Sequence, residues 1–164
     1  MSYRNENRSF FSERLVRKVP DAKELILSAL IAVIAGVIFA VSAVYLKFAA
    51  VIIWAAAAYG AYYLIASLLF KEYEYILTDS VIDIDLVTAK RSRKRLKSIE
   101  LTECIEGGKA EPGKAGEYLC PSKKSDNLYY LVRKHNGVSE TVIIDPNPMM
   151  EEAFGCYMGK SFKG

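Results

Sequence analysis

The chain has 164 residues, with 22 Lys and Arg against 19 Asp and Glu, and therefore a net charge of only +3. This small excess does not favour a nucleic-acid-binding protein, and we expect no nucleic-acid partner. The three cysteines are widely spaced, form no CxxC pair and are accompanied by a single histidine, His135. This pattern predicts free thiols in a reducing compartment, with no metal site and no cofactor.

Residues 1–24 form a basic N-terminal segment. Apolar side chains recur every fourth residue within it, at Phe11, Leu15 and Val19. This spacing fits a short amphipathic helix over 10–19 that lies along the inner leaflet, and a disordered basic tail is the alternative. Pro20 then interrupts the chain. Asp21 and Glu24 have the spacing of a capping box, which predicts the start of the next helix.

Two apolar runs, Leu25–Leu46 and Phe48–Phe70, follow with only Lys47 between them. At about 1.5 Å per residue, each run forms roughly 33–35 Å of helix, which is enough to cross a bilayer core of about 30 Å. Residues 25–70 therefore predict a transmembrane hairpin. A cleaved signal peptide is the competing interpretation of the first run, but the run is about twice the usual length of such a segment.

Orientation follows from the basic residues that flank the two runs. They are Arg14, Arg17, Lys18 and Lys23 before the hairpin, and Lys71 and the stretch 90–97 after it. Cytoplasmic flanks carry the excess of Lys and Arg. We therefore expect a multi-pass protein of the cell membrane with both termini in the cytoplasm and Lys47 outside.

Small residues four apart predict how the two helices pack. The first helix offers Ser28, Ala32, Gly36 and Ala40, and the second offers Ala56 with Gly60, and Ala57 with Ala61. Such stripes let helix backbones approach closely, so we expect them to face each other, with a homodimer through the same stripe as the alternative. Neither helix carries Asp, Glu, Arg or His at membrane depth, which argues against a transporter.

The remaining residues, 71–164, predict a separate cytoplasmic β domain. Strand-like segments occur at 73–77, 81–86, 99–105, 128–132 and 138–144. Asn136-Gly137 predicts a hairpin between the last two, while Gly107-Gly108 is typical of a loop. Asn147 and Pro148 are suited to start a C-terminal helix over Met149–Tyr157. We therefore expect an α+β membrane protein, with an antiparallel β-sandwich or partly open barrel after the hairpin.

One stretch resembles a known family. It reads Tyr75-x-Leu77-Thr78-Asp79, then Val81, Ile82 and Ile84, then the basic stretch Arg91–Lys97, then Ile99-x-Leu101. This resembles the opening strands of bacterial pleckstrin-homology-like (PH-like) domains, and the whole layout resembles small, uncharacterised bacterial membrane proteins. The resemblance implies a β module closed by a C-terminal helix and no enzymatic activity. Family members often have Gly in the second hairpin turn, where this chain has Val87-Thr88-Ala89, so we expect a longer turn.

The basic run is the best functional candidate. It comprises Lys90, Arg91, Arg93, Lys94, Arg95 and Lys97. We expect this density of charge to be too high for an ordinary strand. Two strands of similar length, out from Lys71 and back, return the chain to the membrane side near Thr88. We therefore expect the six side chains to contact anionic lipid head groups, with a solvated hairpin tip as the alternative.

These observations favour a non-enzymatic, membrane-anchored interaction domain at the inner membrane surface, with another membrane or cytoplasmic protein as partner. The alternative is a structural or regulatory subunit whose helices pack on another membrane protein. We identify no catalytic residues. Asp83 and Asp85 alternate along one strand face that we expect to be solvated, without sign of a pocket.

Overall fold

The computed structural model describes residues 9–46, 50–111, 113–135 and 137–163. The chain divides into two compact units that do not follow its order. The helical unit holds residues 19–71 and the short segment 88–92, and the β unit holds the remainder. Lys47 and Asn136, which we expected in two hairpin turns, lie outside the described residues.

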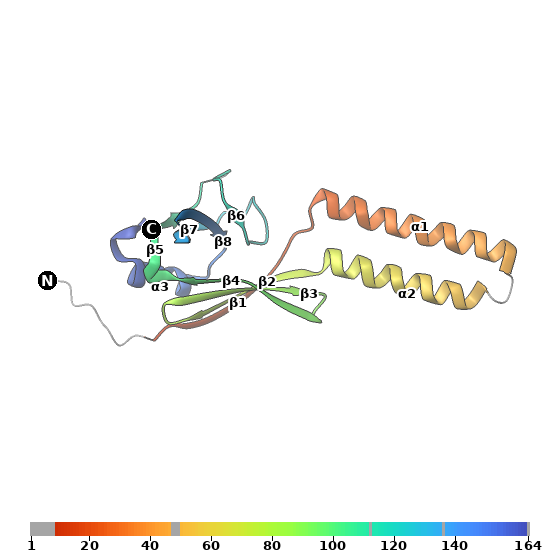
Figure 1. The fold of residues 1–164 in the computed structure, drawn as a ribbon, viewed down its shortest axis with the longest axis horizontal. Coiled ribbons are helices and arrows are strands. Elements are labelled where there is room, and N and C mark those ends of the chain that lie inside the picture. Colours follow the sequence, from red (N-terminus) through yellow and green to blue (C-terminus); the bar gives the residue numbers. More distant parts are fainter. Residues whose placement is uncertain (1–8, 47–49, 112, 136, 164) are drawn as a thin grey trace. The chain divides into compact units, whose positions relative to one another are not determined.

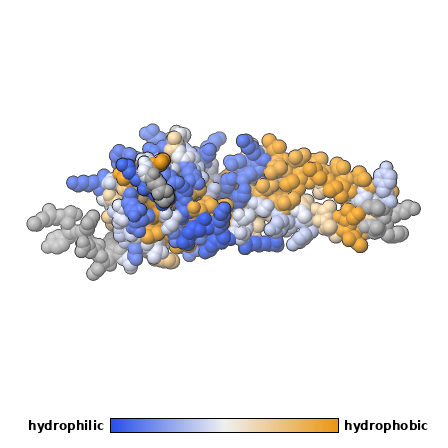
Figure 2. Space-filling view, in the orientation of Figure 1, coloured by the Kyte–Doolittle hydropathy of each residue, from blue (hydrophilic) through white to orange (hydrophobic). Residues whose placement is uncertain are grey.

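The helical unit is an antiparallel pair, α1 (Ala22–Leu46) and α2 (Ala50–Leu69) (Figure 1). Both are long and apolar enough to cross a membrane, and apolar side chains cover most of their visible surface (Figure 2). One bond of the predicted capping box is present, because the Asp21 backbone N–H donates to Glu24 at 3.0 Å. Glu24 also pairs with Lys71 at 2.8 Å, which joins the start of α1 to the residue that follows α2 by two positions.

The two helices do not pack through the predicted stripe. Ala32, Gly36 and Ala40 are exposed, and a Cβ atom added to Gly36 would meet no other atom within 4 Å. The less exposed positions of α1 are Glu24, Ser28, Ile31, Ala35 and Ser42. The predicted α1 face was therefore wrong except for Ser28. The less exposed side of a helix follows a mixed spacing of three and four residues, whereas the predicted residues are four apart throughout.

On α2 the prediction was wrong for Ala56, which is exposed. Gly60 is half-buried, as are its neighbours Ala57 and Ala61, although a Cβ atom at Gly60 would meet no other atom within 4 Å. A polar contact holds the pair at its far end instead: Trp54 Nε1 donates to Ser42 Oγ at 2.7 Å. The Trp54 ring also lies against Phe39, with ring centroids 4.1 Å apart.

The N-terminal segment forms a strand, β1 (Phe11–Arg17), which corrects both the helical and the disordered interpretation. It pairs antiparallel with β2 (Lys71–Thr78), in a register that sets Arg17 opposite Glu72. Ser12 and Val16 point to the buried face of β1, whereas Phe11 and Leu15 are exposed. Residues four apart share one face of a strand as well as one face of a helix, so the apolar spacing fits both structures. The helical hairpin is therefore inserted between two paired strands.

The β unit contains two sheets. The first has the order β1-β2-β3-β4, with β3 at Val81–Thr88 and β4 at Ser92–Glu100. The second has the order β6-β8-β7-β5-β9. Its strands are β5 (Cys104–Lys109), β6 (Glu117–Tyr118), β7 (Tyr129–His135), β8 (Val138–Ile144) and β9 (Phe162–Lys163). The sheets stay separate among the described residues, which gives the open form of the expected β module.

Two sequence interpretations of the β unit were wrong. The alternating stretch 99–105 is not one strand, because a 3₁₀ turn at Leu101–Glu103 separates β4 from β5. Gly107 and Gly108 lie in β5 rather than in a loop. A Cβ atom at Gly108 would come within 2.3 Å of the Lys163 carbonyl oxygen, so glycine is needed for the close approach of β9.

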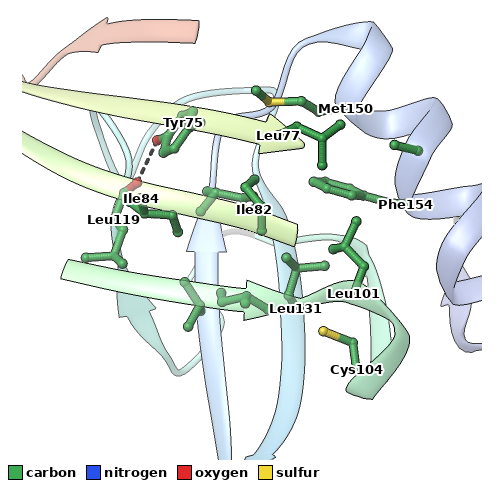
Figure 3. Packing of buried hydrophobic residues seen from close by; sticks show 14 of the residues in the cluster. Tyr75, Leu77, Ile82, Ile84, Leu101, Cys104, Leu119, Leu131, Met150 and Phe154 are labelled. Atoms are coloured by element: carbon green, nitrogen blue, oxygen red, sulfur yellow. Dashed lines mark hydrogen bonds between the residues drawn. The ribbon is translucent and has the colours of Figure 1, made fainter. Parts of the chain in front are cut away.

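The main core lies between the sheets and under helix α3 (Pro148–Met158) (Figure 3). Met150 and Phe154 point from α3 toward the strands, and Tyr75 donates to the Leu119 carbonyl oxygen at 2.6 Å. The predicted cap of α3 is confirmed, since Asn147 accepts from the Met150 backbone N–H at 2.9 Å. The predicted hairpin is confirmed as well, with β7 and β8 paired up to His135 opposite Val138.

Candidate functional site

The basic run spans a turn and a strand. The turn is a two-residue one, because the Arg91 N–H donates to the Thr88 carbonyl oxygen at 3.0 Å. Ala89 and Lys90 adopt φ values of 50° and 56°, which is the geometry of a type I′ turn. The expectation of a longer turn was therefore wrong, and the backbone strain that glycine normally relieves is carried by two residues with side chains.

From Ser92 onward the run is part of β4. Our expectation that its charge density is too high for a strand was therefore wrong. The physical reason lies in the neighbouring strands, which supply acidic partners. Arg93 binds both carboxylate oxygens of Glu74 on β2, at 2.7 and 2.6 Å. Burial, together with the nearby Glu13 carboxylate, raises the pKa of Glu74, and Arg93 opposes that rise.

Arg95 forms ion pairs with both aspartates of β3, Asp83 and Asp85. Its Nε donates to Asp85 at 3.0 Å, and its NH1 lies 3.0 Å from Asp83. The hydrogen bond to Asp85, and then the charge of Asp83, raise the pKa of Arg95. Asp85 is buried, which corrects our expectation of a solvated carboxylate. Both aspartates are engaged in ion pairs within the first sheet.

Lys97 is bound by two carboxylates of the second sheet, Glu117 at 2.7 Å and Glu140. Burial acts to lower the pKa of Lys97, but the hydrogen bonds to Glu117 and Glu140 outweigh it, and the pKa is raised. Arg133 adds a second cation to Glu140 at 2.9 Å. The sequence contained no sign of this cluster, because its members are separated by up to 43 residues.

The other half of the run has no such partners. Within the described part of the chain, the side chains of Lys90, Arg91 and Lys94 take part in no hydrogen bond or ion pair, and all three are exposed. The turn belongs to the helical unit. The Ala89 backbone N–H donates to the carbonyl oxygen of Phe70, the residue directly after α2, at 2.6 Å.

Other candidate chemistry is limited. Cys104 and Cys120 are buried, and burial raises the pKa of each thiol to about 11, so neither is a ready nucleophile. Cys156 is exposed on α3. Among the described residues, no three His, Cys, Asp or Glu side chains are grouped to hold a metal ion. The side chain of His135 lies outside the described residues.

Comparison with known proteins gives one relationship. Searches of curated proteins and of solved structures returned no match. A family model described as Bacterial PH-like domain (DUF6106) matches residues 8–163. The match begins before β1, continues through the helical hairpin and ends at β9, so it includes both units. Because this model matches nearly the whole chain, the chain belongs to this family of bacterial PH-like domains.

Proposed function

We propose that this protein is a non-enzymatic, membrane-anchored interaction module that presents its PH-like β unit at the inner membrane surface. The observation that carries the proposal is the hairpin surface. Most described side chains of α1 and half of those of α2 are exposed and few are buried, although both helices are overwhelmingly apolar. An apolar surface of this extent is not stable in water and indicates a lipid or protein environment.

The proposed orientation rests on charge. Both ends of the hairpin continue into paired strands of one sheet, β1 and β2. The described residues around these ends include Arg17, Lys18 and Lys71, in keeping with a cytoplasmic flank. In this orientation both termini lie in the cytoplasm and the α1–α2 turn lies outside.

The proposed interaction surface is the edge strand β1. It is one of the two edge strands of the first sheet among the described residues, the other being β4, and its side chains Phe11 and Leu15 are 66% and 54% exposed. Exposed strand edges can pair with an extended segment of another protein, and apolar side chains next to the edge provide specificity. The polar side chains of the neighbouring strands serve in ion pairs, which favours binding over catalysis.

Cysteine labelling in intact cells tests the topology. Cys156 is an exposed natural probe in the β unit, and Tyr45, 79% exposed near the end of α1, offers a position for an engineered one. We expect a membrane-impermeant maleimide to label Tyr45→Cys in a Cys156→Ser background and to leave Cys156 unlabelled until the cells are opened. Labelling of Cys156 in intact cells, or extraction of the protein by alkaline carbonate, contradicts the proposal.

The alternative, a subunit whose helices pack on another membrane protein, is favoured by the exposed small residues Ala32, Gly36 and Ala40. Paired variants of the detergent-solubilised full chain separate the two. Loss of a captured partner with Leu15→Glu, but not with Gly36→Leu, supports the β1 edge. The reverse pattern supports the helix face and overturns the role of the edge.

A further inference from the structure

We infer that the basic run has two separate tasks: Lys90, Arg91 and Lys94 bind the phosphates of anionic membrane lipids, whereas Arg93, Arg95 and Lys97 hold the β unit together. This division rests on the proposed membrane anchoring and deepens it, because it names the residues and the lipid class. The sequence alone shows six equivalent cations.

The first step is the balance of charge. Each cation of the second group lies within 3.0 Å of at least one carboxylate oxygen, so its charge is compensated inside the protein. The first group has no acidic partner among the described residues and is exposed. Lys71, the other cation just after α2, is already paired with Glu24 at 2.8 Å. Within the basic run, the uncompensated charge is therefore concentrated at the turn and at the start of β4.

The second step is position. The turn is tied by the Ala89 N–H to Phe70, one residue beyond the end of α2, and closed by the bond from Arg91 to Thr88. If α2 ends at the membrane surface, Lys90 and Arg91 lie at the level of the lipid phosphates. Lys94 is three residues further along an extended strand, about 10 Å from Arg91. That distance is close to one Debye length at physiological salt, about 8 Å, so the charge of Lys94 adds to that of Arg91.

The third step is the nature of the ligand. A hairpin turn fixed at the exit of a membrane helix meets lipid head groups before any soluble partner. Flexible Lys and Arg side chains bind phosphate oxygens through charge-assisted hydrogen bonds. A juxtamembrane cluster of this kind selects anionic over zwitterionic lipids without requiring a particular head group. The ligand class is therefore anionic phospholipid in the leaflet that surrounds the hairpin.

The test uses the full chain in two kinds of lipid nanodisc, one of phosphatidylcholine and one containing 30% phosphatidylglycerol. Insertion is first verified by quenching of Trp54 fluorescence with brominated acyl chains. An amine-reactive reagent then labels the lysines, and mass spectrometry gives the rate at each position. We expect Lys90 and Lys94 to react several-fold more slowly in the anionic discs and to recover in 0.5 M salt. Lys160, exposed after α3, serves as the internal reference.

A matched pair of variants assigns the effect. Arg91→Gln should weaken the protection of Lys90 by anionic lipid, whereas Arg93→Gln, which removes an equal charge two residues away, should leave it unchanged and lower the stability of the β unit. If Arg93→Gln unfolds the β unit, Lys134→Gln replaces it as the charge-matched control. Equal labelling of Lys90 in both discs, with Trp54 quenched, overturns the inference. Unquenched Trp54 contradicts the membrane anchoring itself.

Discussion

The helical hairpin and the β unit are both rich in apolar residues, but their apolar side chains have opposite tasks. In the β unit they lie between two sheets and α3, where Phe154, Leu77 and Ile84 are fully buried. In the hairpin most of them are exposed, and the two helices are joined by the Trp54–Ser42 hydrogen bond and by the Glu24–Lys71 ion pair.

The difference reflects the solvent proposed for each unit. Water drives apolar side chains into the interior of the β unit, because burial removes them from an unfavourable environment. Lipid tails are as apolar as leucine, so the hydrophobic effect does not hold two membrane helices together. Shape, polar contacts and a short connection do so instead. Each unit should therefore respond to a different kind of substitution.

The largest effect is expected for Phe154→Ala. Phe154 is fully buried and touches the ring of Phe162, with centroids 6.0 Å apart. The cavity should cost about 3–5 kcal/mol of the free energy of unfolding of the β unit. Hydrogen exchange of β2 and β7 amides in the detergent-solubilised chain should accelerate by about 10² to several times 10³-fold, since each 1.4 kcal/mol is tenfold. Amides of α1 should not change, and equal acceleration there would contradict the separation of the units.

The matched control is Val138→Ala. Val138 lies in the second sheet and is 70% exposed, so the loss of its methyl groups should change stability by less than about 0.5 kcal/mol. A cost similar to that of Phe154→Ala would show that the two positions do not differ in burial in solution.

The next effect concerns Asn147, which joins α3 to β1. Its side chain caps α3 and also donates to Ser12 Oγ at 2.7 Å. Asn147→Ala should cost about 1–2 kcal/mol, the upper part of the usual range for a lost cap. Asn147→Ser keeps the capping oxygen but is too short to reach Ser12, so it should affect β1 more than α3. Amide exchange of the two elements distinguishes these outcomes, and equal loss in both variants argues against the dual role.

A smaller effect is expected in the hairpin. Trp54→Phe removes the donor to Ser42 while keeping an aromatic ring beside Phe39. A hydrogen bond between membrane helices contributes about 0.6 kcal/mol on average, so exchange of amides near Ser42 should accelerate roughly threefold. Tyr62→Phe, which removes a hydroxyl from a 61% exposed side chain, is the control and should have no effect. Acceleration within the β unit would refute the assignment to the hairpin.

The smallest effect is a pH dependence. The hydrogen bond from Lys97 lowers the pKa of Glu140 below 4.5; burial opposes this, and Arg133 assists it. Because the pKa is lower in the folded state, the stabilisation is present above pH 4.5 and is lost as the pH falls through the folded pKa. Carboxyl-carbon NMR should place the Glu140 midpoint below 4.5, and Lys97→Gln should move it upward. A midpoint at or above 4.5 in the unchanged chain contradicts the cluster.

Local sequence patterns predicted much of the fold because their physical causes are local. Helix length follows from the length of the apolar runs, the start of α3 from Asn147 and Pro148, and the β7–β8 hairpin from a turn dipeptide. The strand β1 escaped prediction, because Phe11, Leu15 and Val19 are compatible with either helix or strand. Pairing with β2, more than fifty residues away in the sequence, selects the strand.

The sequence by itself determined many of the elements, the apolar hairpin, the family resemblance and the presence of a basic run. Only the tertiary structure decided which cations of that run are neutralised. Lys90 and Arg93 are both basic residues of the same run, but Arg93 pairs with Glu74 of another strand, whereas the turn that holds Lys90 is bonded to Phe70, directly after α2. Charge compensation depends on partners brought together from distant positions, and such partners follow from strand pairing rather than from local composition.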